Sequence, residues 1–143
     1  MSKAMLAKAA LSTVLGLFFV NVGIAHFTDT EWFEPIVPKV LGDPTFWVLI
    51  TGVMEIVIGL GLIIPLTRRY SSLLMVLFLV AVYWANLNMW INDIPLDNNT
   101  FAPIWHVFRL IGQLVMIGIA PVSYTHLRAH ETRGNLVCRL LLE

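Results

Sequence analysis

Charged residues are scarce in this sequence of 143 residues. They make up 13% of the chain, whereas a soluble globular protein carries about 25%. Apolar residues make up 58%, which is more than the core of one domain of this length can hide from water. The composition therefore argues against a soluble protein and indicates that lipid surrounds much of the chain.

The charges that are present balance, because nine basic and nine acidic residues give a formal net charge of zero. A balanced chain has no basic excess to attract a polyanion, so nucleic acid is not expected as a partner. The one cysteine, Cys138, excludes a disulfide framework and any CxxC pair within the chain. The sequence also lacks a phosphate-binding loop, a nucleophile elbow and a metalloprotease helix.

The composition changes after Ala120. Residues 122–143 hold three of the six arginines, two of the four histidines and the single cysteine. Read back into DNA, VSYTHLRAHE matches a transposase adapter, and LVCRLLL matches a flow-cell sequence. The bases between the two segments fall where a sample index would sit. We therefore interpret residues 121–143 as translated sequencing adapter and exclude them from the functional argument. The alternative is a natural basic tail.

Four apolar segments remain, at about residues 7–27, 46–64, 70–91 and 103–120. A membrane-spanning helix needs about 20 mostly apolar residues. The first segment has the shape of a signal peptide, but its uncharged run from Ala9 to Thr28 exceeds the usual signal core of about 7–15 residues. A retained helix is expected, with a cleaved signal as the alternative. The predicted fold is all-α: a polytopic four-transmembrane-helix bundle in one domain, residues 1–120.

The basic residues predict the orientation of these spans. Lys3 and Lys8 precede the first span, and Arg68 and Arg69 lie between the second and third. The two longer loops carry mainly acidic residues, with Lys39 as the only base. Because positive loops stay cytoplasmic, both termini are expected inside. All five tryptophans then fall near the outer interface, which suits these rings: Trp32, Trp47, Trp84, Trp90 and Trp105.

The first outer loop, FTDTEWFEPIVPKVLGDP, is too apolar to extend freely into water. It contains Trp32, Phe33, Ile36 and Val37. We expect this loop either to dip into the membrane interface or to cover the helix bundle.

Two ionisable residues lie inside the predicted spans. Glu55 falls near the middle of the second span, and Arg109 lies about one and a half turns below the outer end of the fourth. An isolated charge at such depth costs about 2.5–3.5 kcal/mol and marks a functional site by default. We expect an ion pair between them that faces a polar cavity open to the outside, and we regard both as candidate catalytic residues. The pair could instead only hold helices together, or Glu55 could be protonated and unpaired.

Helical spacing places several polar residues near this pair. Gly52, Glu55 and Gly59 share one stripe, and the two glycines allow another backbone to approach closely. The candidate ligand-binding residues are Asn21, His26, Tyr83, Asn86 and Gln113. The amides could instead bond between helices, His26 could reach for the interface, and the aromatic residues could belong to an interfacial belt. A metal site is not expected, because His26 and His106 have no identifiable further ligands.

The chain resembles the DoxX family of small four-helix membrane proteins. The matching segments are VGIAHF, EPIVPKVL, ITGVMEIVIGLGLIIPLTRR, VAVYWANLNMW and RLIGQLVMI, spread over residues 10–120. The resemblance implies a bacterial or archaeal cytoplasmic membrane and shared polar positions at Glu55, Asn86, Arg109 and His26.

The family also implies a function, because some relatives are subunits of a thiosulfate:quinone oxidoreductase and others accompany membrane complexes that handle thiol stress. The resemblance therefore predicts an accessory subunit of a quinone-linked redox system, with a quinone as the expected cofactor. Its expected partners are the lipid bilayer and redox-complex subunits or a second copy of the chain. Direct thiol–disulfide exchange is not expected, because residues 1–120 contain no cysteine. A small-solute transporter or channel subunit, and a non-catalytic structural partner, are the alternatives.

Overall fold

The computed structural model of this chain describes residues 3–96 and 102–120. Four long helices run along it: α1 (Lys3–Thr28), α3 (Pro44–Ile63), α4 (Arg68–Ile91) and α5 (Pro103–Ile119). A single helical turn, α2 (Thr30–Phe33), follows α1. The described residues form no sheet, so the predicted all-α class is confirmed. Residues 121–143, the predicted adapter-derived tail, lie outside the described residues.

Three of these helices are long and apolar enough to cross a membrane: Met5–Thr28, Pro44–Ile63 and Arg68–Ile91. The fourth, α5, is apolar but has 17 residues, about 25 Å of helix against a hydrocarbon core of about 30 Å. Large apolar side chains such as Val14, Leu77 and Val80 are exposed on the helix surfaces. These features suggest a multi-pass membrane protein.

Local chemistry fixes the helix ends around the α3–α4 pair. Asp43 accepts a hydrogen bond from the backbone N–H of Thr45 at 3.1 Å, and Pro44 occupies the first turn of α3, both typical of a helix start. At the other end, the Arg68 guanidinium donates to the carbonyls of Leu62 and Ile63 at 2.9 and 3.1 Å. These bonds satisfy carbonyls that the end of a helix leaves without partners.

Glycines bring α1 and α3 into direct backbone contact. A Cβ atom added to Gly16 would lie 2.5 Å from the carbonyl oxygen of Gly59, and one added to Gly59 would lie 2.6 Å from that of Gly16. Seven residues along each helix, a Cβ on Gly23 would lie 2.7 Å from the Gly52 carbonyl oxygen. Only glycine permits these approaches, which are typical of helix packing inside membranes. The contact predicted for Gly52 and Gly59 is confirmed, and α1 is the partner.

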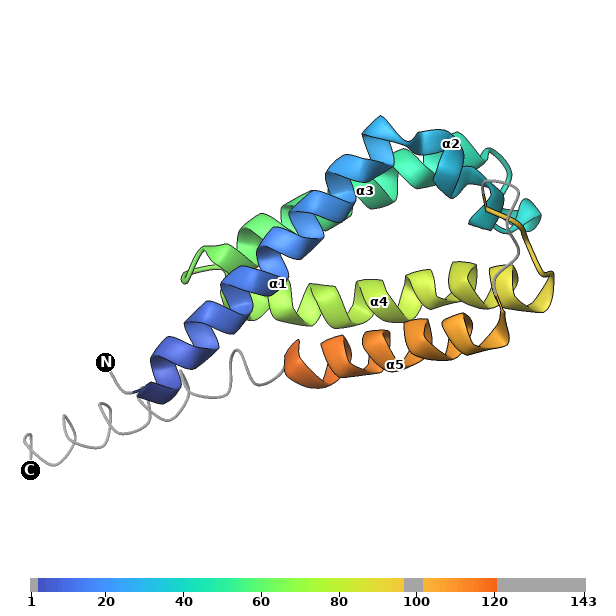
Figure 1. Cartoon of the computed structure of the whole chain (residues 1–143). Helices are drawn as coiled ribbons and strands as arrows, with labels where there is room; N and C mark the ends of the chain where they lie inside the picture. Colours follow the sequence, from blue (N-terminus) through green and yellow to red (C-terminus); the bar gives the residue numbers. More distant parts are fainter. Residues whose placement is uncertain (1–2, 97–101, 121–143) are drawn as a thin grey trace, which may run out of the picture.

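The four long helices form two pairs, α1 with α3 and α4 with α5, which diverge from the α3–α4 turn toward the α2 end (Figure 1). The buried apolar core lies where the pairs converge, and it comes from α1, α3, α4 and the residue that follows α5: Leu15, Phe19, Ile58, Leu62, Met75, Phe78, Leu79 and Ala120. The diverging ends leave space that this core does not fill.

The first interhelical loop crosses the space between the diverging ends. It contains α2 and two short 3-10 turns, Glu34–Ile36 and Lys39–Leu41. Trp47 of α3 donates from Nε1 to the carbonyl of Leu41 at 2.7 Å. Asn88 of α4 donates from Nδ2 to the carbonyl of Ile36 at 3.1 Å. The loop is therefore fastened to both helix pairs and covers the bundle, which is the second of the two arrangements expected for it.

The glycine contact predicts the cost of adding one methyl group. Gly59→Ala places a Cβ against the Gly16 carbonyl and the Val20 backbone, so the helices must separate and the free energy of unfolding is expected to fall by about 1–3 kcal/mol. Thermal unfolding in mild detergent measures this. Gly112→Ala in α5 is the control, because nothing lies within 4 Å of the new atom. Equal stability of the two variants would contradict the α1–α3 contact.

Candidate functional site

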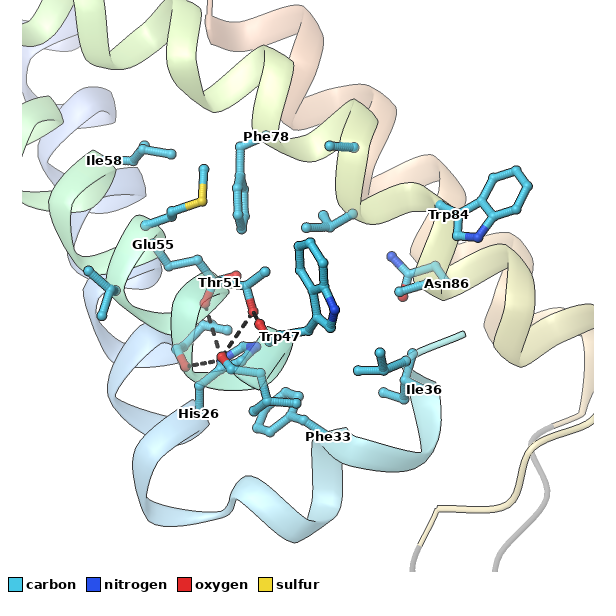
Figure 2. Close-up of a pocket in the computed structure, with 18 of the residues that line it drawn as sticks. His26, Phe33, Ile36, Trp47, Thr51, Glu55, Ile58, Phe78, Trp84 and Asn86 are labelled. Atoms are coloured by element: carbon cyan, nitrogen blue, oxygen red, sulfur yellow. Dashed lines mark hydrogen bonds and ion pairs between the residues drawn. The ribbon is translucent and has the colours of Figure 1, made fainter. Parts of the chain in front are cut away.

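A cleft of about 1020 Å³ lies between the two helix pairs. Its walls come from α1, α3 and α4, one residue of α5 reaches it, and the loop after α1 forms its roof (Figure 2). Rim residues such as Phe18, Leu74 and Leu77 are exposed on the apolar helix surfaces. The cleft therefore opens sideways, toward the surface that lipid would cover, while the loop closes its end near α2.

Most of the residues that line the cleft are apolar or aromatic. The side chains that bring polar groups to it belong to His26, Thr51, Glu55, Asn86, Arg109 and the two tryptophans, Trp47 and Trp84. We expected a polar cavity open to the outside; the structure shows mainly apolar walls instead, and the loop after α1 covers the end of the cleft near α2. The walls are apolar because the helix faces turned inward below the polar residues carry Val22, Ile58 and Phe78.

Glu55 and His26 form the polar centre of the cleft. Glu55 Oε2 lies 3.2 Å from His26 Nδ1, and the two side chains are 13% and 11% exposed. The same Nδ1 lies 2.9 Å from the carbonyl oxygen of Val22, one helical turn earlier in α1. The His26 ring also stacks on Phe33 of the roof, with centroids 4.0 Å apart. A roof residue and two helices thus fix the imidazole beside the carboxyl group.

The predicted ion pair between Glu55 and Arg109 is wrong for this structure, because the partner of Glu55 is His26. The reason is the glycine stripe: Gly52 and Gly59 pack on α1, and Glu55 shares their face of α3. Arg109 lies on α5, which packs on α4, and its Nη1 is 2.9 Å from the sulfur of Met89. Both residues still line the cleft, on opposite sides.

Asn86 and Gln113 join α4 to α5. Asn86 Nδ2 lies 3.3 Å from Gln113 Oε1, and Gln113 Nε2 donates to the carbonyl of Leu79. Gln113 is buried and does not line the cleft, so bonding between helices describes it better than ligand contact. Asn86 bonds to Gln113 on the neighbouring helix and also lies on the cleft wall (Figure 2).

Two other candidate ligand-binding residues do not reach the cleft. Asn21 is exposed and absent from the lining, because it lies five positions before His26 in α1 and is turned well away from that face. Tyr83 is half-buried and also absent from the lining, while its neighbour Trp84 is present. Both residues were expected at the ligand cavity, and neither lines the cleft.

The structure adds residues that the sequence analysis did not select as site residues. Phe33 stacks on His26, and Trp47 connects α3 to the roof. Thr51 lies one turn before Glu55, with its hydroxyl 2.8 Å from the Trp47 carbonyl oxygen. The apolar character of the loop and the spacing of Trp47, Thr51 and Glu55 along one helix face were available signals for these residues.

No group of three or more histidine, cysteine, aspartate or glutamate side chains in the described ranges could hold a metal ion. His26 and His106 belong to different surroundings: His26 stacks on Phe33, whereas His106 stacks on Trp90 with centroids 5.6 Å apart. What the cleft offers is a carboxyl–imidazole pair at the roofed end of a largely apolar space.

A family model described as a domain of unknown function (DUF8561) matches residues 15–123, which is most of the chain. No curated protein and no solved structure matches it. The matched segment includes the cleft residues of all four long helices.

The amide contact between α4 and α5 predicts an energetic coupling. In a double-mutant cycle, Asn86→Ala and Gln113→Ala are expected to couple by about 0.6 kcal/mol, the average for hydrogen bonds between membrane helices. Unfolding in detergent measures each variant. Asn21→Ala combined with Gln113→Ala is the control pair and is expected to be additive, because Asn21 is exposed on α1. Additivity in both cycles would contradict the contact.

Proposed function

This chain belongs to the DUF8561 family, and we propose that it is a four-span, DoxX-like membrane protein whose cleft binds a membrane-dissolved quinone as an accessory subunit of a redox system. The observation that carries the proposal is the Glu55 carboxyl group, which lies at the wall of a largely apolar cleft with Oε2 3.2 Å from His26 Nδ1. A buried polar group is costly unless it is hydrogen-bonded, and Oε2 accepts no hydrogen bond within the described part of the chain, so a ligand that bonds the carboxyl group would offset that cost.

The arrangement of the helix ends supports four spans with both termini in the cytoplasm. The start of α1 and the α3–α4 turn lie at the same end of the molecule, away from α2 (Figure 1). That end carries Lys8, Arg68 and Arg69, whereas the roof carries Glu31 and Glu34. Basic residues at one end and acidic residues at the other fit a cytoplasmic and an outer side. In this arrangement, α5 spans as a short fourth helix.

The size and walls of the cleft suit a substituted ring. Ligand pockets usually measure about 300–1,000 Å³ and are mainly apolar with a few polar groups that fix orientation. This cleft, of about 1020 Å³, is slightly larger than the upper end of that range. Trp47 and Phe78 offer aromatic surfaces near Glu55, and the lateral opening meets lipid (Figure 2). A ligand dissolved in the bilayer could therefore enter without crossing water.

The side chains around the ring would have separate roles. Glu55 and His26 would hydrogen-bond a ring oxygen and hold a proton beside it. Arg109, on the opposite side of the cleft, would place positive charge near the other end of the ring. The roof would exclude water from the outer end. A bound quinone supplies two-electron, two-proton chemistry, for which a partner subunit would be the electron donor.

The proposal predicts that quinone copurifies with the protein. After purification in mild detergent and extraction with organic solvent, mass spectrometry is expected to find quinone at close to one molecule per chain. Glu55→Gln weakens a hydrogen bond to a charged group, worth about 1.5–3 kcal/mol, so its quinone content is expected to fall about tenfold.

Glu31→Gln is the matched control for this experiment, because Glu31 is exposed and does not line the cleft. It is expected to keep the quinone content of the wild type. A folded wild-type protein without quinone would overturn the proposal and favour a structural role for the cleft residues.

The proposed orientation predicts which loops a membrane-impermeant maleimide reaches in intact cells. In a Cys138→Ser background, Val40→Cys in the roof is expected to react from outside, because Val40 is 83% exposed and lies at the acidic end. Leu66→Cys, in the α3–α4 turn and 88% exposed, is expected to react only after the cells are opened. The reverse pattern would show that the orientation is wrong.

A further inference from the structure

We propose that the ligand of the cleft carries a long apolar tail, and that this tail leaves the cleft through a gap at Ala81, between α3 and α4. The ring then binds under the roof while most of the tail stays in the bilayer. This inference rests on the proposed function and specifies the class of ligand and its exit. It follows from the exposure and the size of the side chains that line the cleft.

Residues that line the cleft and are also exposed show where it meets the molecular surface. On α1 that residue is Phe18, and Arg109 of α5 is half-buried. Outside the roof, most of the exposed lining residues belong to α3 and α4. They include Met54, Val57, Leu74, Leu77, Ala81 and Trp84. The main opening of the cleft therefore lies between these two helices.

The exposed lining residues of α4 form one stripe along the opening. Leu74, Leu77, Ala81 and Trp84 follow one another at steps of three, four and three residues, which keeps them on one face of the helix. The stripe is about 15 Å long at 1.5 Å per residue. Three of its side chains are large, whereas Ala81 carries a single methyl group. Ala85, the lining residue one turn further on, is equally small. The stripe therefore has a gap between Leu77 and Trp84.

The opening is bounded at both ends. At one end, α3 and α4 meet around the buried core, which includes Leu62. At the other end, Trp47 and Asn88 fasten the roof to the two helices. The helices diverge between these ends (Figure 1), and the Trp84 ring is directed away from the centre of the cleft (Figure 2). A flexible chain can therefore pass between the helices at the level of Ala81.

The solvent around the protein decides what the tail contributes. The polar groups at the roofed end attract the ring, whereas lipid chains are as apolar as leucine side chains. A tail that moves from lipid into the cleft therefore gains little free energy, and the site has no need to match the whole length of the tail. A free exit is required instead, because a ring under the roof cannot bind if its tail has no path to the lipid.

Two quinones that differ only in their tails test this exit on the full chain in lipid nanodiscs. The probes are a dimethoxy-methyl-benzoquinone without a tail and the same ring with a decyl tail, measured by calorimetry against protein-free nanodiscs. Ala81→Phe fills the gap, so we expect the decyl quinone to bind about tenfold more weakly. The affinity for the tail-less ring is expected to stay unchanged, because the ring lies under the roof.

Val80→Phe is the matched control, because Val80 is the neighbouring residue, is exposed and does not line the cleft. It is expected to keep the wild-type affinity for both probes. The ratio of the two affinities is compared between proteins in the same lipid, so that partitioning of the probes into the bilayer cancels. Equal ratios in Ala81→Phe and Val80→Phe would overturn the exit at Ala81.

A photoreactive tail tests the same exit in the wild type, independently of how the variants fold. A diazirine within the decyl tail is expected to label residues that border the gap, such as Val57 and Leu77, and excess unlabelled decyl quinone should prevent this. Labelling confined to Phe18 of α1 would overturn the proposed exit and leave the proposed function standing. If the folded wild type binds neither quinone, the proposed function fails and the exit fails with it.

Discussion

The backbone contact between α1 and α3 is the constraint on which the rest of this structure depends. Gly16 meets Gly59, and Gly23 meets Gly52, so that the two helices lie closer together than side chains would allow. One turn beyond Gly52 along the same stripe, Glu55 must face α1, where His26 is the polar side chain at its level. The partner of the buried acid is thus set by helix packing rather than by charge alone.

The cleft is a consequence of how the other helices are joined. Because α1 and α3 pair closely and α5 packs on α4, the two pairs meet only in the core near the α3–α4 turn (Figure 1). Their ends near α2 diverge, and the loop after α1 crosses the gap. Hydrogen bonds from Trp47 on one pair and Asn88 on the other hold that loop in place. The roof therefore connects the two pairs at the end where they diverge.

Polar side chains in this fold divide into two groups with different partners. Gln113, Thr67 and Arg68 bond to backbone carbonyls or to a neighbouring helix and are satisfied within the protein. Glu55 lies at the wall of the cleft, where its carboxyl group meets the His26 imidazole. In an apolar environment the first group stabilises helix contacts, whereas the carboxyl–imidazole pair lines open space. Position at the cleft separates the candidate site from the structural polar residues.

The sequence by itself determined the all-α class, the approximate bounds of the four long helices, the glycine stripe on α3 and the position of Glu55 on that stripe. These follow from hydropathy and helical periodicity, which depend only on residues near one another in the chain. The tertiary structure decided that α1 is the partner of that stripe, that His26 rather than Arg109 meets Glu55, and that Asn21 and Tyr83 lie outside the cleft. Periodicity shows which residues share a face, but which helix that face meets depends on packing between segments distant in the chain.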